Sequence, residues 1–318
     1  MRAWQVFEPG EPGDVLKLND VEVPQPGPGQ VLVRVKAAAL NFPDVLLCRG
    51  QYQIRPPMPF TPGVELCGVV EGTGQRVIGT PVLPYGALAD YAVMEEAELF
   101  AAPESLDDAA ASGLLIAYQT GWFGLHRRAN LKAGETLLVH AAAGGVGAAA
   151  VQLGKAAGAT VIAVVGGPSK AEVARQLGAD VVIDRREQDF IKVVKEVTGG
   201  RGADVIYDPV GGAAYAGSAK CVAFEGRILI VGFASGDVPA PALNHALVKN
   251  YSIVGLHWGL YRQHNPASIR DCHEVLTGLA AQGLISPLVS EKLPLEEAPS
   301  GLTKLGAGET TGRIVVTP

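Results

Sequence analysis

The chain has 318 residues, of which 48% are hydrophobic and 18% are charged, and its formal net charge at pH 7 is -6. This length exceeds the usual size of one domain, and the apolar content is sufficient for a globular core, so we expect two domains. The mild acidity, together with the lack of a basic cluster in the sequence, argues against nucleic acid or an anionic membrane as a partner.

The N-terminal residues, MRAWQVFEPGEPGDVLKL, lack the charged start, apolar core and small-residue cleavage site of a signal peptide. Apolar stretches elsewhere are interrupted before they reach membrane-spanning length. We therefore expect a cytoplasmic protein that does not enter a membrane. The cysteines are isolated, without a CxxC pair or a Cys/His group at zinc-ligand spacing, and are expected to be reduced thiols: Cys48, Cys67, Cys221 and Cys272.

The first part of the chain, residues 1–115, consists of short β-rich runs separated by Gly and Pro, such as VLVRVKAAAL and GVELCGVVEG. Alternation of apolar and polar residues, as in Val31, Val33 and Val35 against Arg34 and Lys36, indicates half-buried strands. These patterns predict a compact β domain.

Residues 116–250 have a different pattern. Apolar strands such as TLLVH, TVIAVVG and RILIVGF alternate with Ala-rich or amphipathic helical segments. This βαβα order predicts a doubly wound parallel sheet with helices on both faces. The order is lost in residues 251–318, which end in the strand candidate GRIVV, so we expect this segment to return to the first domain.

A glycine-rich junction joins the predicted strand ETLLVH to the predicted helix AVQLGKAAGA. The spacing of Ala141, Gly144 and Gly147 is a variant of the dinucleotide-binding fingerprint. Small residues there allow a sharp turn, close contact of helix and strand, and a pyrophosphate on the amides at the helix N-terminus. The predicted phosphate cradle comprises Ala143, Gly144, Gly145, Val146 and Gly147.

The end of the second predicted strand indicates which dinucleotide is bound. NAD enzymes place a carboxylate there for the ribose hydroxyl, whereas this chain has Gly166, followed by Ser169 and Lys170. A hydrogen-bond donor and a cation, with no carboxylate beside them, suit a 2′-phosphate, so NADPH is favoured over NADH. Because this second strand does not end in an acid, a methyltransferase is disfavoured. Arg185 is either a second cation for this phosphate or a solvated surface charge.

Several motifs together resemble the zinc-independent medium-chain dehydrogenases/reductases, specifically the NADPH:quinone oxidoreductases (zeta-crystallin-like). They are HAAAGGVG, NFPDVLLCRGQY, PGVELCGVV, GALADYAV, AYQTGWFGL and VIYDPVGG. The resemblance runs over essentially the whole chain. It implies α/β architecture: a Rossmann NADPH-binding domain at 116–250 and a GroES-like catalytic domain formed by 1–115 and 251–318.

The resemblance also implies that no metal is bound. Zinc alcohol dehydrogenases similar to this chain carry a Cys in the stretch matching KAAALNFPD and a His at the position of Val64, and this chain has neither. Without a Lewis acid, alcohol oxidation is not expected. A quinone, by contrast, accepts hydride from a stacked nicotinamide with little acid assistance.

By resemblance, three residues of the first domain are candidates for the catalytic site. Asn41 is expected to cap the helix that follows it and to lie at the nicotinamide end of the cleft. Asp44 either pairs locally or orients its neighbours. Tyr52 is expected at the substrate, as a proton donor or a stacking ring, or else it is an aromatic residue at the edge of the core.

Further contacts with the cofactor are expected from the second domain and the closing strand. Thr120 is expected at the nicotinamide ribose or carboxamide, and Phe123, about one helical turn later, is expected to face the same cleft. Arg313 in the closing strand either reaches the cofactor or is exposed. Residues after two further strands are expected at the carboxyl edge of the sheet, where this topology binds ligands: Phe233, Ser235, Leu256, His257 and Trp258.

The function expected from these features is an NADPH-dependent quinone reductase that acts on a small electrophile. An NADPH-dependent enoyl or alkenal reductase is the second enzyme hypothesis, since related enoyl reductases carry a tyrosine at the position matching Tyr52. A non-enzymatic NADPH-binding protein is the third. The family is commonly dimeric, and RILIVGF and NYSIVGL are apolar enough to supply the sheet edge of a homodimer.

Overall fold

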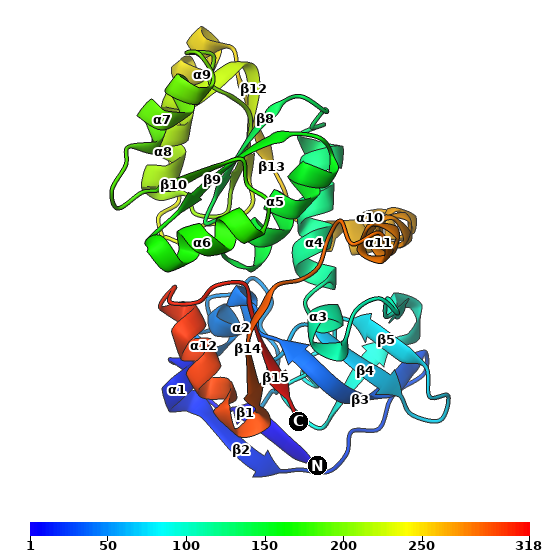
Figure 1. Ribbon diagram of the computed structural model, residues 1–318. Helices are drawn as coiled ribbons and strands as arrows, with labels where there is room; N and C mark the ends of the chain where they lie inside the picture. The colour runs from blue at the N-terminus through cyan, green and yellow to red at the C-terminus, as the bar shows by residue number, and fades with distance from the viewer. The chain divides into compact units, whose positions relative to one another are not determined.

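The protein, described by a computed structural model over residues 1–318, forms two compact units (Figure 1). Unit 1 contains Met1–Ile116 and Ser286–Pro318, and unit 2 contains Ala117–Ile285. The second segment of unit 1 therefore begins later than the residue 251 expected from the sequence. Residues 251–285 stay in unit 2 because β13 (Ser252–Gly255) pairs with β12 (Val222–Ile230) in its sheet.

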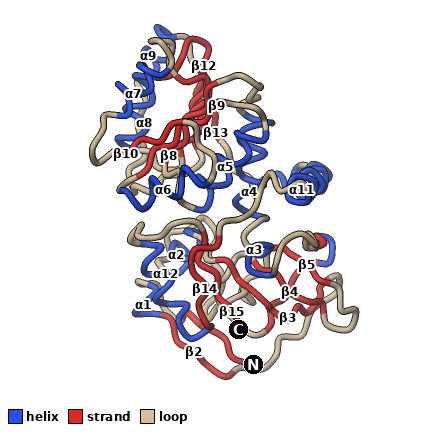
Figure 2. The backbone as a smooth tube through the Cα atoms, viewed as in Figure 1, coloured by secondary structure: helices blue, strands red, loops and turns tan.

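Unit 1 is rich in strands, which the tube view shows in red (Figure 2). Its first segment contains β1 (Arg2–Val6), α1 (Pro12–Val15), β2 (Leu16–Asp20), β3 (Gln30–Ala39), α2 (Phe42–Cys48), β4 (Leu66–Val70), β5 (Arg76–Gly79), β6 (Tyr91–Glu95), η1 (Glu96–Glu98), β7 (Phe100–Ala101) and α3 (Asp108–Ser112). Its second segment contains β14 (Val289–Pro294), η3 (Leu295–Glu297), α12 (Ala298–Gly306) and β15 (Arg313–Thr317).

The closing strand β15 joins the two segments of unit 1. It pairs antiparallel with β3 and parallel with β14, within a seven-stranded sheet of order β14-β15-β3-β4-β5-β7 in which β6 also pairs with β3. Strands β1 and β2 form a separate antiparallel pair. Apolar residues from both segments, among them Val35, Leu66, Leu302 and Val316, share one core. The return of the C-terminal end to the first domain is thus seen in the strand pairing.

Unit 2 alternates strands and helices. It contains most of α4 (Leu115–Trp122), η2 (Phe123–Arg128), β8 (Thr136–His140), α5 (Gly145–Ala156), β9 (Thr160–Val165), α6 (Pro168–Gln176), β10 (Val181–Asp184), α7 (Phe190–Val197), β11 (Ala203–Asp208), α8 (Gly212–Cys221), β12, α9 (Leu243–Lys249), β13, α10 (Gly259–His264) and α11 (Pro266–Ala281). The six strands are all parallel, in the order β10-β9-β8-β11-β12-β13.

Helices cover both faces of this sheet because successive strand residues point to opposite sides. Leu137 on β8 lies within 2.5 Å of a Cβ built at Gly154, so this face packs closely on α5. The next residue, Leu138, belongs to a core cluster with Val194 of α7 and Tyr215 of α8. The expected doubly wound parallel sheet is confirmed. None of the helices has both the length and the apolar character needed to span a bilayer.

Candidate functional site

The junction between β8 and α5 forms a cradle of backbone amides at the carboxyl edge of the parallel sheet. Gly144 is the N-cap residue of α5, and no side chain caps this helix. The first-turn amides of α5 therefore have no acceptor within the helix. A Cβ added at Gly147 would lie 2.2 Å from the carbonyl oxygen of Ala141, so only glycine allows the strand and the helix to approach this closely. The structure brings the predicted phosphate cradle together at this point.

Two guanidinium groups lie over the glycines that follow β9. A Cβ built at Gly166 would be 3.3 Å from the Arg185 guanidinium, and one built at Gly167 would be 3.0 Å from the Arg186 guanidinium. Asp184 accepts hydrogen bonds from the amides of Gly167 at 2.9 Å and Arg186 at 3.0 Å, which ties the two loops together. These bonds lower the pKa of Asp184, with the nearby arginines adding to the effect.

Ser169 and Lys170 begin α6 directly after these glycines, because α6 starts at Pro168. The expected donor and cation therefore share one loop edge with Arg185. Arg186 was not singled out from the sequence, although it stands beside Arg185 in VIDRRE. Two adjacent cations after a strand were the available signal.

A buried polar cluster occupies unit 1 between α2, β4 and β15. Glu65 is fully buried and Arg313 is 6% exposed, and the two form an ion pair. Asn41 links them, donating from Nδ2 to Glu65 at 2.9 Å and accepting from Arg313 Nη1 at 2.9 Å. The other Glu65 carboxylate oxygen accepts from the amide of Ile116 at 2.8 Å. Burial raises the pKa of Glu65, and the charge of Arg313 opposes that shift.

Asp44 is the fully buried acid at the start of α2. Its carboxylate accepts hydrogen bonds from the amides of Asn41 at 2.8 Å, Gly63 at 2.9 Å and Val64 at 3.0 Å. Burial raises the pKa of Asp44 to about 7, although the three amides act in the opposite direction. Asp44 thus pairs locally, and it fixes both the first turn of α2 and the turn before Glu65.

The structure rules out one of the two alternatives for Arg313 and adds a residue that the sequence analysis did not name. Arg313 is not exposed, because Asn41 and Glu65 enclose its guanidinium. Its Nε is buried without a hydrogen-bond partner. Glu65 was not predicted as a site residue. A single acid inside the apolar run PGVELCGVV was the sequence signal for a buried, paired carboxylate.

Tyr52 and Thr120 have partly exposed positions. Tyr52 follows α2 and packs its half-buried ring against the core of unit 1. Thr120 is half-buried on α4, next to Gln119, whose Oε1 accepts from Trp258 Nε1 at 2.9 Å. Gln119 Nε2 is buried and has no hydrogen-bond partner. Since buried donors are nearly always satisfied, a bound ligand or water could complete this group.

Phe123, which was expected near the ligand from its spacing to Thr120, has a buried side chain. It begins η2, a π-helical turn, and its side chain is fully buried with its ring centroid 4.2 Å from that of Tyr261. The structure therefore places Phe123 in the core of unit 2.

The remaining predicted residues lie after β12 and β13, at the carboxyl edge of the sheet. Phe233 is 39% exposed, and the Ser235 hydroxyl donates to the carbonyl of Val210 at 2.7 Å, which holds this loop to the one after β11. Leu256 is half-buried, and its amide donates to Ile230 at 3.1 Å. His257 is exposed.

The donor set does not fit a zinc ion. No group of three or more His, Cys, Asp or Glu side chains converges anywhere in the chain. The cysteines are all buried and free, and burial raises the pKa of the Cys48 and Cys67 thiols to about 12.

Family models match both units. Residues 27–104 match the alcohol dehydrogenase GroES-like domain, and residues 145–274 match the zinc-binding dehydrogenase model. The match at 27–104 confirms the GroES-like character expected of the first domain. The second description names a metal for which this chain lacks a donor group.

Individual relatives narrow the family. A quinone oxidoreductase-like protein 2 homolog from Nematostella vectensis is 36% identical over 301 residues, covering 91% of this chain and 82% of that protein. The Escherichia coli quinone oxidoreductase complexed with NADPH is 28% identical, covers all of both chains and has a TM-score of 0.92. A phthioceranic/hydroxyphthioceranic acid synthase from Mycobacterium tuberculosis is 33% identical over 96% of this chain, which matches only 15% of that protein. These similarities confirm the resemblance stated from the sequence motifs.

Proposed function

The chain belongs to the quinone oxidoreductase family of the medium-chain dehydrogenases/reductases, and from this premise we propose that it reduces a quinone or similar electrophilic carbonyl compound with NADPH. The single observation that carries the proposal is the amide cradle at the start of α5. Gly147 leaves no room for a Cβ against Ala141, which is the close approach that a pyrophosphate-binding turn requires.

A 2′-phosphate on the adenosine ribose fits the groups that follow β9. Arg185 and Arg186 hold their guanidinium groups against Gly166 and Gly167, and a guanidinium binds phosphate with two parallel hydrogen bonds. Lys170 would add a third positive charge. The glycines replace the carboxylate that would repel this phosphate, so these residues support a preference for NADPH over NADH.

NADPH, when bound, supplies the hydride. The protein's part is then to orient the cofactor and exclude water, because a quinone ring needs little help from an acid. We assign the cofactor phosphates to the cradle and to the cations after β9. Thr120, Trp258 and the unsatisfied amide of Gln119 are proposed to contact the nicotinamide end.

Asn41, Asp44 and Tyr52 are proposed as the catalytic group of unit 1, with Arg313 holding Asn41 in place. Of these, Tyr52 is the proposed group for a proton or a stacking contact, since its ring is only half-buried. Asp44 and Glu65 act as positioning residues, because all their observed bonds go to amides, Asn41 or Arg313.

The nucleotide preference can be tested with the double variant R185Q/R186Q. We expect kcat/KM for NADPH to fall about tenfold to a hundredfold, since a hydrogen bond to a charged group contributes ~1.5–3 kcal/mol. The value for NADH should change little. Arg175→Gln, which removes an exposed arginine from the last turn of α6, at the end of that helix away from Gly166 and Gly167, is the control. Equal losses with both nucleotides would contradict the assignment of the 2′-phosphate.

The acceptor can be tested by steady-state rates with 1,4-benzoquinone, a naphthoquinone, 2-alkenals and crotonyl thioester. The proposal expects the highest kcat/KM with a quinone and a small effect of Tyr52→Phe on that rate. Preferential reduction of the alkenals or the thioester would replace it with the second candidate.

That second candidate is an NADPH-dependent enoyl or alkenal reductase. The observation that favours it is the similarity of this chain to a segment of an acid synthase. Reduction of a C=C bond requires a proton at the neighbouring carbon, so Tyr52→Phe should then lower kcat strongly. Tight NADPH binding without turnover of any acceptor would instead indicate a non-enzymatic NADPH-binding protein.

We also propose that the protein is a homodimer. Strand β13 is paired with β12 on one side only and stands at the edge of the six-stranded sheet. An open edge can add a strand from a second copy. Gel filtration with light scattering should give twice the mass of 33.0 kDa, and a monomer would contradict the proposal. The cytoplasmic location stays a prediction.

A further inference from the structure

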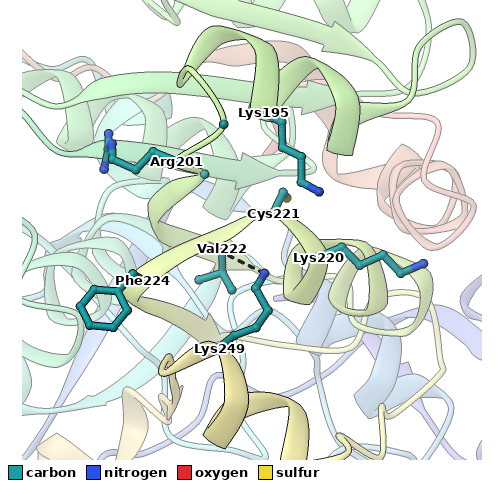
Figure 3. A pocket seen from close by; sticks show the side chains of 9 residues that line it. Lys195, Arg201, Lys220, Cys221, Val222, Phe224 and Lys249 are labelled. Carbon is teal, nitrogen blue, oxygen red and sulfur yellow. Dashed lines mark hydrogen bonds between the residues drawn. The ribbon is translucent and has the colours of Figure 1, made fainter.

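A second concave site lies in unit 2 at the amino edge of the parallel sheet (Figure 3). It is a hollow of about 310 Å³ beside the first residues of β11 and β12. The cradle described above lies at the carboxyl ends of the strands, so this hollow occupies the opposite edge of the same sheet. Its lining residues are Lys195, Gly200, Arg201, Gly202, Lys220, Cys221, Val222, Phe224 and Lys249.

The charge of this hollow contrasts with that of the whole chain. Its lining contains three lysines and one arginine and no acid, in a chain of net charge -6. Arg201 is neutralised by an ion pair with Asp204. Lys195 and Lys220 are exposed and have no ion-pair partner. The sequence showed no basic cluster because these residues come from separate segments that only the fold brings together.

Three helices deliver the lysines, each from its last turn. Lys195 lies in the last turn of α7, Lys220 in that of α8 and Lys249 in that of α9. A lysine at a helix C-terminus is ordinarily explained by the partial negative charge there, about half an elementary charge per helix. The helix dipole does not explain why three such helix ends lie around one hollow. The three lysines also carry three positive charges, which is more than the summed partial negative charge of three helix ends.

Lys249 and Lys195 approach the same point. Figure 3 shows both side chains reaching toward Cys221, one from each side. Lys249 is anchored by bonds to the carbonyls of Ala219 at 2.8 Å and Val222 at 3.4 Å. Burial lowers the pKa of Lys249, and the charge of Lys195 lowers it further, against the effect of Cys221. A bound anion would relieve this repulsion between the two ammonium groups.

The loop between α7 and β11 forms a fixed wall of the hollow. At Gly202, φ is +92°, and a Cβ there would lie 2.4 Å from the carbonyl oxygen of Cys221. The Thr198 hydroxyl accepts from the Gly202 amide at 2.9 Å and holds this turn. Phe224, with 71% of its surface exposed, provides an aromatic side at the rim. The wall is therefore preorganised rather than formed by mobile side chains alone.

We propose that this hollow is a second anion site that binds a phosphate group of a small phosphorylated compound, separate from the dinucleotide cradle. The ammonium groups of Lys195 and Lys249 lie on either side of Cys221, and Lys220 adds a further positive charge to the lining of the hollow. Such a cluster suits a compact multivalent anion, because the charges add at short range. The exposed ring of Phe224 suits a flat aromatic group attached to that phosphate. Inorganic polyphosphate and a nucleotide share this phosphate chemistry, but only a nucleotide has a base that can stack on the Phe224 ring.

The test is isothermal titration calorimetry with inorganic pyrophosphate, and separately with ADP, on the full chain and the double variant K195Q/K220Q. Loss of the two charges is expected to raise the Kd for pyrophosphate at least about fivefold, from Coulomb's law in water. Lys192→Gln removes an exposed lysine from the same helix, outside the hollow, and should leave the Kd unchanged. The titrations are done with saturating NADPH, so that the dinucleotide cradle is already occupied and the heat reports binding at the hollow.

A tighter Kd for ADP than for pyrophosphate, lost in Phe224→Ala, would assign a nucleotide to the site. Equal Kd values would assign a simple phosphate ligand. Lys249→Met is a further variant that removes the lysine nearest Cys221. Its melting temperature is measured first, because Lys249 also bonds two backbone carbonyls. The proposal is overturned if pyrophosphate gives no heat with the full chain, or if K195Q/K220Q and K249M both bind it as the full chain does.

Discussion

The buried ion pair between Glu65 and Arg313 gives the sharpest prediction for unit 1. In Glu65→Gln the shape of the side chain is kept, but the amide nitrogen faces a donor, from Ile116 on one side or from Asn41 and Arg313 on the other. The variant therefore loses at least one accepted bond and leaves the Arg313 guanidinium, 6% exposed, without its counter-charge. Removing one partner of a buried pair costs about 3–5 kcal/mol.

The assay is urea unfolding, analysed for the free energy of unfolding of unit 1. Trp4 lies in unit 1, whereas Trp122 and Trp258 lie in unit 2, so fluorescence in a W122F/W258F background follows unit 1. The indole of Trp4 donates to the carbonyl of Leu295 at 2.7 Å, so its fluorescence depends on unit 1 being folded.

The matched control is Glu296→Gln, which breaks a pair with Arg2 in which both side chains are largely exposed, at 53% and 40%. An exposed pair contributes about 0–1 kcal/mol. The reasoning is refuted if Glu65→Gln costs no more than this control, since the buried cluster would then contribute no more than a surface contact.

Gly147→Ala should abolish measurable NADPH binding in calorimetry, because the added Cβ would lie 2.2 Å from Ala141 O, whereas Gly144→Ala, at 3.4 Å, should retain most of it; equal affinities would contradict the cradle. Gly278→Ala, inside α11 with no atom within 4 Å of the new Cβ, should raise the free energy of unfolding by about 0.5–1 kcal/mol, and a lower melting temperature would count against it. Because burial raises the pKa of Asp44 from 3.8 to about 7, its protonated form favours folding, and stability should fall as pH rises from 4 to 7, by up to about 4 kcal/mol. Asp44→Asn should flatten that part of the pH profile, and an unchanged slope would show that other groups cause it.

Local patterns in the sequence were sufficient to predict the architecture. The alternation of apolar strands with helical segments predicted the parallel sheet, and the small residues from Ala141 to Gly147 predicted its phosphate-binding turn. Both features depend on contacts between neighbours in the chain, where periodicity and residue size directly limit the backbone.

Only the tertiary structure decided which distant residues meet. Glu65 pairs with Arg313 across 248 positions of sequence, and the last turns of three helices bring Lys195, Lys220 and Lys249 to the lining of one hollow. The ring of Phe123 is buried against Tyr261, which lies 138 positions later, and the pairing of β13 with β12 kept residues 251–285 in unit 2. Electrostatic partners and strand neighbours depend on distances in space, which one-dimensional spacing does not contain.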